Sequence, residues 1–171
     1  MSWLPLRATL RDGTPVRVRR HAAADTPAAA ALLRHAVTVD RAWPWEAPLD
    51  DAAFIAYWCS HLLGAFYVKP NFPGRCDHLA NGGFVTAPAA RRRGVGTLMA
   101  AVHARAAADL GYRGVVFNLV FANNAAAGAL WARVGMRRVG TIPAAARMPV
   151  TGGGGGEAEY VDAHILYRSL V

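Results

Sequence analysis

The sequence has little lysine, little cysteine and few acidic side chains, and each scarcity excludes a class of site. Lys69 is the only lysine among 19 basic residues, Asp and Glu total 11, and the formal net charge is +8. A Walker-type phosphate loop needs a lysine directly after its glycines, and Lys69 stands in no such motif. The two cysteines, Cys59 and Cys76, lack metal-ligand spacing, so we expect reduced thiols and no metal.

Long apolar runs are also missing. The longest, Phe54–Val68, is interrupted by Ser60 and His61, so we expect no membrane-spanning segment and no membrane partner. The first residues lack the charged and apolar regions of a signal peptide, which favours a cytoplasmic location. The length of 171 residues predicts a single domain over residues 1–171, with a flexible glycine-rich loop at about 150–157.

The positive charge raises the question of nucleic-acid binding. The arginines are scattered along the chain except at Arg91–Arg93, and few alternate with aromatic residues. We therefore expect no nucleic-acid partner and assign the local charge to a phosphate-bearing small molecule. A basic nucleic-acid-binding module remains an alternative, which salt-sensitive retention on DNA or RNA would reveal.

Residues 84–99 carry the most informative pattern. An apolar strand, Gly83–Thr86, leads through a proline-containing turn into Arg91-Arg-Arg-Gly94-Val-Gly96, which opens an alanine-rich helix. Free backbone N–H groups at a helix start, the positive end of the helix dipole and arginine side chains together favour a phosphate site. A dinucleotide fingerprint would need a third glycine where Met99 stands. A basic helix start with a glycine turn is the purely structural alternative.

Periodicity predicts an alternating order of strands and helices without internal repeats. Strands are expected at 14–20, 54–59, 62–68, 78–86, 114–121, 136–142 and 160–170, and helices at 25–38, 93–110 and 124–134. The double glycine Gly82-Gly83 inside a strand suggests a bulge or the close approach of a ligand.

Two motifs resemble the GNAT family of N-acetyltransferases. Arg91-x-x-Gly94-x-Gly96 resembles its pyrophosphate loop, and the segment from Asn124 to Met136 resembles its Asn-x-x-Ala-x-x-Leu-Tyr-x-x-x-Gly-Phe helix. The resemblance covers nearly the whole chain. It implies an α/β (α+β) GNAT fold with a mixed, mostly antiparallel sheet of six to seven strands, splayed near its middle and flanked by about four helices. It also implies acetyl-CoA as cosubstrate, with its pantetheine arm between residues 81–86 and 114–119.

The same resemblance implies which residues hold the coenzyme. Backbone groups of Gly83–Val85 would pair with the arm, and the Val85 N–H is one candidate donor to the oxyanion. Asn124 would bond to the arm near the thioester, and Trp131 stands where many members have a Tyr that protonates the leaving thiolate. Indole cannot serve as that acid, so we predict that Trp131 packs against the coenzyme, with core packing as the alternative. The implied coenzyme residues are Phe84, Val85, Arg91, Arg92, Arg93, Gly94, Val95, Gly96, Thr97, Asn124, Ala127 and Trp131.

Two segments that contain three asparagines are similar to a narrower group, the acetyltransferases that detoxify the proline analogue L-azetidine-2-carboxylate. They are His78-Leu-Ala-Asn81-Gly-Gly-Phe84 and Phe117-Asn118-Leu-Val-Phe121-x-x-Asn124. That group acetylates the ring amine of small imino acids, including cis-4-hydroxyproline. The similarity implies that Asn81 and Asn118 act in catalysis and substrate binding, by holding a carboxylate or an oxyanion. Alternatively, Asn118 bonds only to a bulged neighbouring backbone.

Other site assignments rest on residue type. His78 is a candidate base acting through water, with a structural hydrogen-bonding role as the alternative. Trp43 and Trp45 are predicted to form an apolar lid over the substrate, although core packing or a dimer contact fits them equally. The segment 160–171 completes the sheet or crosses to the second subunit of a possible homodimer.

The sequence therefore predicts an acetyl-CoA-dependent N-acetyltransferase in which the amine of a small molecule attacks the thioester directly. Two alternatives stay open besides nucleic-acid binding: acetylation of a peptide or protein, and a coenzyme A-binding module without chemistry.

Overall fold

The computed structural model of the chain describes residues 1–42, 57–58, 62–149 and 158–171. Three predictions fall wholly or mostly outside these ranges. They concern the lid residues Trp43 and Trp45, the strand at 54–59 and the glycine-rich loop at 150–157.

The N-terminal part forms a hairpin followed by a helix. β1 (Leu6–Thr9) and β2 (Pro15–Arg20) pair antiparallel, and β3 (Tyr57–Trp58) pairs antiparallel with the other edge of β2. α1 (Thr26–Thr38) has a proline in its first turn, where the ring fixes a helical φ and the missing N–H needs no partner.

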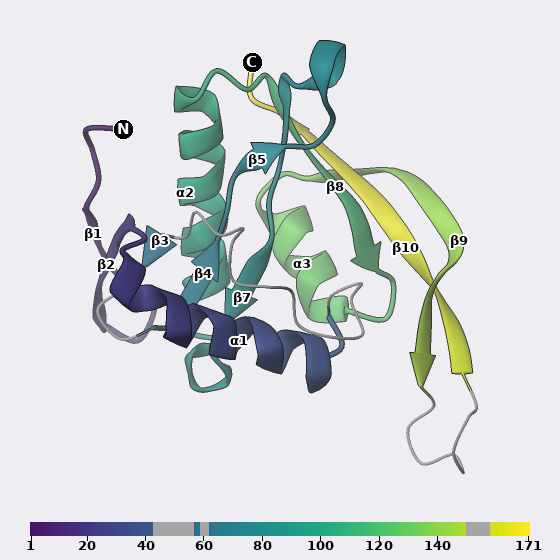
Figure 1. Cartoon of the computed structure of the whole chain (residues 1–171), viewed down its shortest axis with the longest axis horizontal. Helices are drawn as coiled ribbons and strands as arrows, with labels where there is room; N and C mark the ends of the chain where they lie inside the picture. Colours follow the sequence, from purple (N-terminus) through teal and green to yellow (C-terminus); the bar gives the residue numbers. More distant parts are fainter. Residues whose placement is uncertain (43–56, 59–61, 150–157) are drawn as a thin grey trace.

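The central strands separate at the double glycine. β4 (Gly64–Phe66) pairs antiparallel with β7 (Phe84–Thr86), and β5 (Lys69–Pro70) pairs antiparallel with β6 (Leu79–Asn81). β6 also pairs in parallel with β8 (Gly114–Phe121), through two residue pairs only. β6 and β7 follow each other in the chain yet belong to different sheets, so the strand predicted at 78–86 divides at Gly82-Gly83. Beyond this point β7 and β8 diverge (Figure 1), which is the predicted splay.

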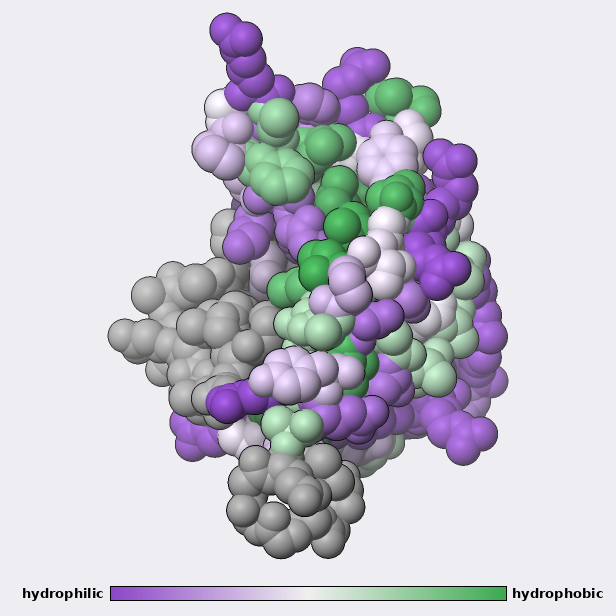
Figure 2. All heavy atoms as spheres, turned by 90° about the vertical axis from the view of Figure 1, so that its right-hand side faces the viewer, coloured by the Kyte–Doolittle hydropathy of each residue, from purple (hydrophilic) through white to green (hydrophobic). Residues whose placement is uncertain are grey.

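The C-terminal part ends in a long hairpin. After α3 (Ala125–Arg133), β9 (Arg137–Pro149) and β10 (Ala158–Ser169) pair antiparallel and extend away from the body of the molecule (Figure 1). β10 lies between β8 and β9 in the order β5-β6-β8-β10-β9, so the C-terminal strand completes the sheet of its own chain. Figure 2 looks onto the β9–β10 side, where apolar side chains form a band between hydrophilic ones.

The helices lie on two faces of the sheet. α1 buries Ala29 and Leu33 against Ala65 of β4 and Val85 of β7. On the opposite face, α2 (Val95–Asp109) and α3 bury side chains against β6, β8 and β10. The described residues contain three α-helices where the resemblance implied about four, and their sheets are mostly antiparallel, as predicted.

An aromatic cluster fills the interior on the α2–α3 face, below the point where the strands diverge. It consists of Phe66, Phe84, His103, Phe117 and Trp131, with neighbouring ring centroids 4.6–5.9 Å apart. Across the part of the chain that the structure describes, no helix combines the length and apolar character needed to cross a bilayer.

Candidate active site

The basic glycine loop leads directly into the start of α2. Arg92 and Gly94 adopt left-handed backbone conformations, with φ of 63° and 95°, and Gly94 is the N-cap residue. No side chain caps this helix, so the N–H groups of Val95, Gly96 and Thr97 lack the partners that a capping side chain would supply. A row of free donors at the positive end of a helix suits a phosphate group. The residues present therefore fit the pyrophosphate of a coenzyme.

Gly94 is needed for its backbone conformation, whereas Gly96 is needed because another helix packs against it. A methyl group at Gly96 would approach Leu130 Cδ2 to 3.1 Å, which is tighter than ordinary contact. The glycine therefore lets the start of α2 approach α3 closely. This brings the start of α2, the predicted phosphate site, next to α3, whose N-cap is Asn124.

The three loop arginines have different environments. Arg91 forms an ion pair with Asp40, just after α1, and Arg93 forms one with Asp12 in the β1–β2 turn and donates to Thr14 Oγ1 at 2.7 Å. The hydrogen bond from Arg93 is the main reason why the pKa of Asp12 falls to about 2. Arg92 is exposed and makes no ion pair within the described residues. Arg91 and Arg93 therefore anchor the loop, and Arg92 is the arginine free to meet a phosphate.

Backbone hydrogen bonds flank the β4–β7 ladder on both sides. The Tyr67 N–H donates to the Gly83 carbonyl at 3.2 Å, and the Ala87 N–H donates to the Leu63 carbonyl at 2.9 Å. Hydrogen-bonded and non-hydrogen-bonded pairs alternate along an antiparallel ladder. The Tyr67–Gly83 and Leu63–Ala87 pairs are both hydrogen-bonded. The Ala65–Val85 pair, which lies midway between them, is therefore hydrogen-bonded as well.

This alternation corrects the predicted role of Val85. Val85 opposes Ala65, so its N–H is used by β4 and cannot stabilise an oxyanion. Phe84 and Thr86 occupy the non-hydrogen-bonded positions, and their backbone groups point away from β4 toward the side where β8 diverges. These are the groups that can pair with an extended ligand, in the manner of an added strand.

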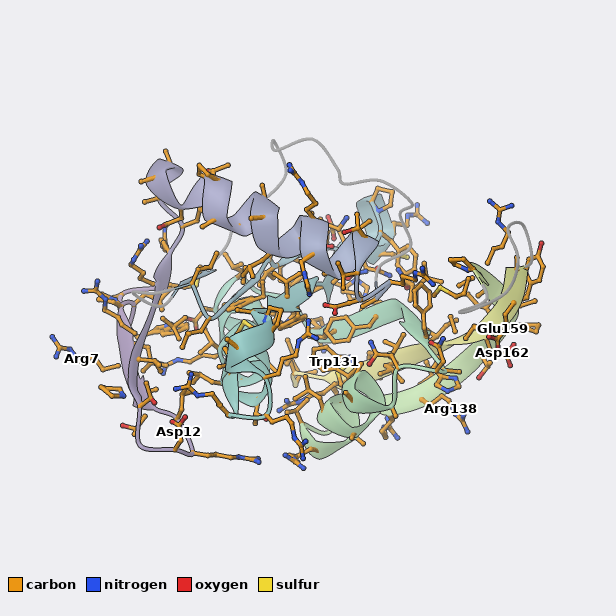
Figure 3. All side chains as sticks on the ribbon, turned by 90° about the horizontal axis from the view of Figure 1, so that it is seen from below. Arg7, Asp12, Trp131, Arg138, Glu159 and Asp162 are labelled. Carbon is orange, nitrogen blue, oxygen red and sulfur yellow. The ribbon has the colours of Figure 1, made fainter. Side chains whose placement is uncertain are left out.

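Trp131 lies in the core. Its side chain is 8% exposed and its ring packs against Phe84 at 4.8 Å and Phe117 at 4.6 Å. Figure 3 shows it in the interior, far from the labelled charged residues of the hairpins. The structure therefore gives Trp131 the core role that the sequence had offered as the alternative, directly beneath the diverging strands. A contact with the coenzyme stays a prediction.

Asn124 caps α3. Its Oδ1 accepts a hydrogen bond from the Ala127 N–H at 3.0 Å, which satisfies one of the free donors of the first turn. Because the oxygen is used by the cap, the Nδ2 donor is the group that can reach a coenzyme. The predicted contact with the pantetheine arm therefore has a defined donor, and it stays a prediction.

Asn81 and Asn118 are brought together by a third asparagine, Asn71, which the sequence analysis did not single out. Asn71 Oδ1 accepts hydrogen bonds from Asn81 Nδ2 at 2.5 Å and from Asn118 Nδ2 at 2.7 Å. Asn71 Nδ2 donates in turn to Asn118 Oδ1 at 3.2 Å. We call these three residues the amide cluster. Asn118 thus bonds to the side chain of Asn71, and not simply to a bulged neighbouring backbone.

The amide cluster lies on the sheet face opposite α2 and α3. Ala80 and Phe117, the neighbours of Asn81 and Asn118 along their strands, are buried against α2 and α3. Because successive side chains in a strand alternate between faces, the two asparagines project from the other face. The cluster spans β6 and β8 where they cease to pair.

The structure does not bring His78 to the amide cluster. His78 is exposed and precedes β6, and its carbonyl accepts a hydrogen bond from the Arg113 N–H at 2.9 Å. It lies in the turn before β6, and no hydrogen bond joins it to the cluster in the part of the chain that the structure describes. Its role as a base acting through water stays a prediction.

A second histidine, absent from the sequence predictions, lies beneath the site. His103 of α2 is 2% exposed, and its Nε2 lies 3.5 Å from the Asn81 carbonyl oxygen. Burial lowers the pKa of His103 to about 4, so the ring is neutral at physiological pH. An added methyl group at Gly82 would lie 2.3 Å from this nitrogen, so Gly82 has to be glycine for the strand to approach α2.

No group of three or more His, Cys, Asp or Glu side chains gathers into a possible metal site among the residues that the structure describes. The groups that the described residues offer for chemistry are backbone donors, the amide cluster and Arg92.

Comparisons with known proteins agree on one family. The sequence model of the acetyltransferase (GNAT) family matches residues 18–136. The N-acetyltransferase aca1 of Schizosaccharomyces pombe is 44% identical over 119 residues, which is 69% of this chain and 54% of that protein. The chain thus spans about half the length of this relative.

Solved structures share the fold. A GNAT N-acetyltransferase from Kribbella flavida superimposes with a TM-score of 0.79 at 29% identity, over 90% of this chain and 97% of that one. A phosphinothricin acetyltransferase from Sinorhizobium meliloti in complex with acetyl-CoA gives a TM-score of 0.76 at 18% identity, over 90% and 88% of the two chains. The splayed sheet, the basic glycine loop and these matches together show that the chain belongs to the GNAT family of acetyltransferases.

Proposed function

We propose that this chain transfers the acetyl group of acetyl-CoA to the ring amine of a small imino acid such as L-azetidine-2-carboxylate or cis-4-hydroxyproline. The observation that carries the proposal is the amide cluster. It lies where β6 and β8 cease to pair, beside the backbone groups of β7 that can hold an extended ligand. An acetyl group at the end of the pantetheine arm would meet the acceptor there.

The coenzyme is held in three places. The N–H groups of Val95 to Thr97 and the Arg92 side chain receive the pyrophosphate, while Phe84 and Thr86 pair with the arm. Asn124 Nδ2 donates to the arm near the thioester. These contacts fix the thioester carbonyl relative to the amide cluster, so positioning supplies much of the rate.

The reaction is a direct attack of the neutral amine on the thioester carbonyl carbon. A C–N bond forms and the C–S bond breaks, so the amine loses its N–H proton and coenzyme A leaves and becomes a thiol. The backbone N–H of Phe84 or Thr86, or an amide of the cluster, donates to the oxyanion. Trp131 has no transferable proton, and water accepts and returns the protons.

The amide cluster also suits an acceptor that carries a carboxylate. Each amide has two N–H groups and uses one of them inside the cluster, so one N–H on each of Asn71, Asn81 and Asn118 remains for a ligand. Converging N–H donors favour an anion. Asn81 Oδ1, which accepts no bond within the cluster, can accept from the amine of the same substrate.

Three expectations from the sequence accompany the proposal. We expect the chain to act in the cytoplasm and to need no metal, and a homodimer is an assembly that the sequence allows. Metal independence has a direct check, because EDTA should leave acetyl transfer unchanged.

The test of the proposed function is the release of coenzyme A thiol from acetyl-CoA by the purified chain. L-azetidine-2-carboxylate, cis-4-hydroxyproline, proline and a lysine-containing peptide are offered in parallel. We expect release with the imino acids and its loss in Asn118→Ala, while acetyl-CoA binding by calorimetry is kept. Release with the peptide alone would replace the proposal by peptide acetylation. Failure to bind acetyl-CoA would contradict the proposal as a whole.

A further inference from the structure

Asn71 occupies a fixed place beside the splay. It follows β5, and its backbone N–H donates to the Leu79 carbonyl at 2.7 Å, so it extends the β5–β6 ladder by one residue. Lys69 opposes Asn81 in this ladder, which places Asn71 diagonally across from Asn81 on the same sheet face. The backbone thus sets the position of the Asn71 amide before any side-chain contact is considered.

The Asn71 amide connects the two strands where their backbones stop pairing. Its oxygen accepts from Asn81 of β6 and from Asn118 of β8, and its nitrogen donates back to Asn118. The parallel pairing of β6 with β8 is limited to Leu79–Gly114 and Ala80–Val115. The side-chain bridge through Asn71 therefore connects the two strands beyond their last backbone pair, at the next residue of β6 and three residues further along β8.

These bonds also decide how the neighbouring amides are oriented. An asparagine amide can rotate by half a turn and exchange its oxygen for its nitrogen at little cost unless its partners distinguish the two. Asn71 Oδ1 can be approached only by N–H groups, so it fixes the nitrogen side of Asn81 and of Asn118 toward itself. One N–H of each remains on the outward side. All three residues are half-buried, so these bonds are only partly screened by water.

We propose that Asn71 is the positioning residue of the acceptor site: it orients the Asn81 and Asn118 amides so that their remaining N–H groups receive an anionic group of the acceptor. This inference rests on the proposed function. It assigns to Asn71 the recognition of the acceptor and not the binding of acetyl-CoA.

Two variants of Asn71 separate orientation from charge. Asn71→Ala removes the bridge, and we expect the KM of the imino acid to rise about 10- to 100-fold with a smaller change in kcat and an unchanged KM of acetyl-CoA. Asn71→Asp keeps the shape and the accepting oxygens but adds a negative charge. It should impair L-azetidine-2-carboxylate more than azetidine, the same ring amine without a carboxylate. Asn123→Ala is the control, because it deletes an exposed asparagine outside the cluster.

A second measurement does not depend on turnover. In ¹⁵N–¹H spectra, the side-chain NH₂ signals of Asn81 and Asn118 should shift and exchange faster with water in Asn71→Ala, and stay in place in Asn123→Ala. Unchanged signals, or wild-type kcat and acceptor KM in Asn71→Ala, would overturn the role of Asn71. If the wild-type chain acetylates no amine, the proposed function fails, and the NH₂ signals decide on Asn71 independently.

Discussion

At the scale of single residues, Arg92 differs from both of its neighbours. Arg91 and Arg93 are held by Asp40 and Asp12, whereas Arg92 is exposed in a left-handed conformation with φ of 63°. A non-glycine residue pays roughly 1 kcal/mol or more for that backbone. No contact of Arg92 within the described residues explains the strain, whereas the proposed contact with the phosphates would.

Replacing Arg92 by glycine should therefore separate stability from binding. Arg92→Gly relieves the strained φ, so we expect the free energy of unfolding to stay equal or rise by about 1 kcal/mol. The same change removes a cation from the pyrophosphate, so the Kd of acetyl-CoA should rise about 10-fold, and less at high salt. Calorimetry and urea unfolding measure both quantities, with Arg75→Ala as an exposed control. Unchanged affinity would contradict a phosphate contact.

Asn124 offers a similar separation. Asn124→Ala removes the cap of α3, which should cost about 1 kcal/mol of stability, whereas Asn124→Asp keeps the accepting oxygen and the cap. Both variants lose the Nδ2 donor, so both should raise the KM of acetyl-CoA. Thermal melts and initial rates decide the matter: if Asn124→Asp binds acetyl-CoA like the wild type, Asn124 is a helix cap and nothing more.

The buried His103 makes the stability of the fold depend on pH. Burial lowers the pKa of His103 to about 4 from its ordinary 6.5. Between these values the unfolded chain binds a proton that the folded chain does not, so stability falls as the pH drops through this window, by on the order of 3 kcal/mol. In His103→Leu this part of the pH dependence should vanish in urea titrations between pH 7 and pH 4. The exposed His78→Gln is the control, and an unaltered slope in His103→Leu would refute the assignment.

A residue could be predicted from the sequence where its role depends on its neighbours in the chain, and not where the role depends on contacts that form only on folding. The loop arginines and Asn124 stand in short motifs beside a helix start, where chain neighbours determine the geometry. Asn71 carries no such signal, because β5 has two residues and its partner Leu79 becomes a neighbour only after the chain turns. His103 had a signal that was missed: with Met99 and Ala106 it follows the buried stripe of α2 at helical spacing.

At the scale of elements, the double glycine is the feature that shapes the site. Gly82 faces α2 so closely that a methyl group would lie 2.3 Å from His103 Nε2 and 2.7 Å from the Tyr67 carbonyl oxygen. Side chains keep their alternation across the glycines, since both Ala80 and Phe84 face α2 and α3. The break between β6 and β7 thus bends the chain while its side chains keep the same two faces. Asn81 therefore stays on the face opposite α2 and α3.

Gly82→Ala should accordingly be one of the most damaging small changes in the chain. Because backbone and a buried ring confront the new methyl group, we expect a loss of about 3 kcal/mol or failure to fold. Gly128→Ala in α3 makes the same chemical change in open space, and should be neutral or stabilising by up to about 1 kcal/mol. Equal melting temperatures for the two variants would contradict the close approach of β6 to α2.

The sequence predicted most elements but not all of their pairing. The bounds of β8 and the helix over residues 26–38 agree with the prediction, because an apolar run and a proline-started amphipathic pattern are local signals. β1 was not predicted, and the role of the Val85 N–H was wrong. Both depend on which strand lies alongside, which the residues of a four-residue or three-residue strand do not encode by themselves.

At the scale of the whole molecule, the two faces of the sheet carry different features. The α2–α3 face holds the aromatic cluster and the start of α2, the proposed phosphate site, and the opposite face holds the amide cluster. A pantetheine arm running between β7 and β8 would connect them. We therefore expect the coenzyme to approach from one side and the acceptor from the other, with the acetyl group where the strands diverge.

The most direct test of this account compares L-azetidine-2-carboxylate with azetidine as acetyl acceptors of the wild-type chain. The two share the attacking amine and differ only in the carboxylate that the amide cluster is proposed to receive. We expect acetylated product from the acid with a kcat/KM at least about 100-fold above that of azetidine, since charge-assisted hydrogen bonds to the carboxylate are lost in the latter. Equal values, or no product from the acid while acetyl-CoA binds, would contradict it.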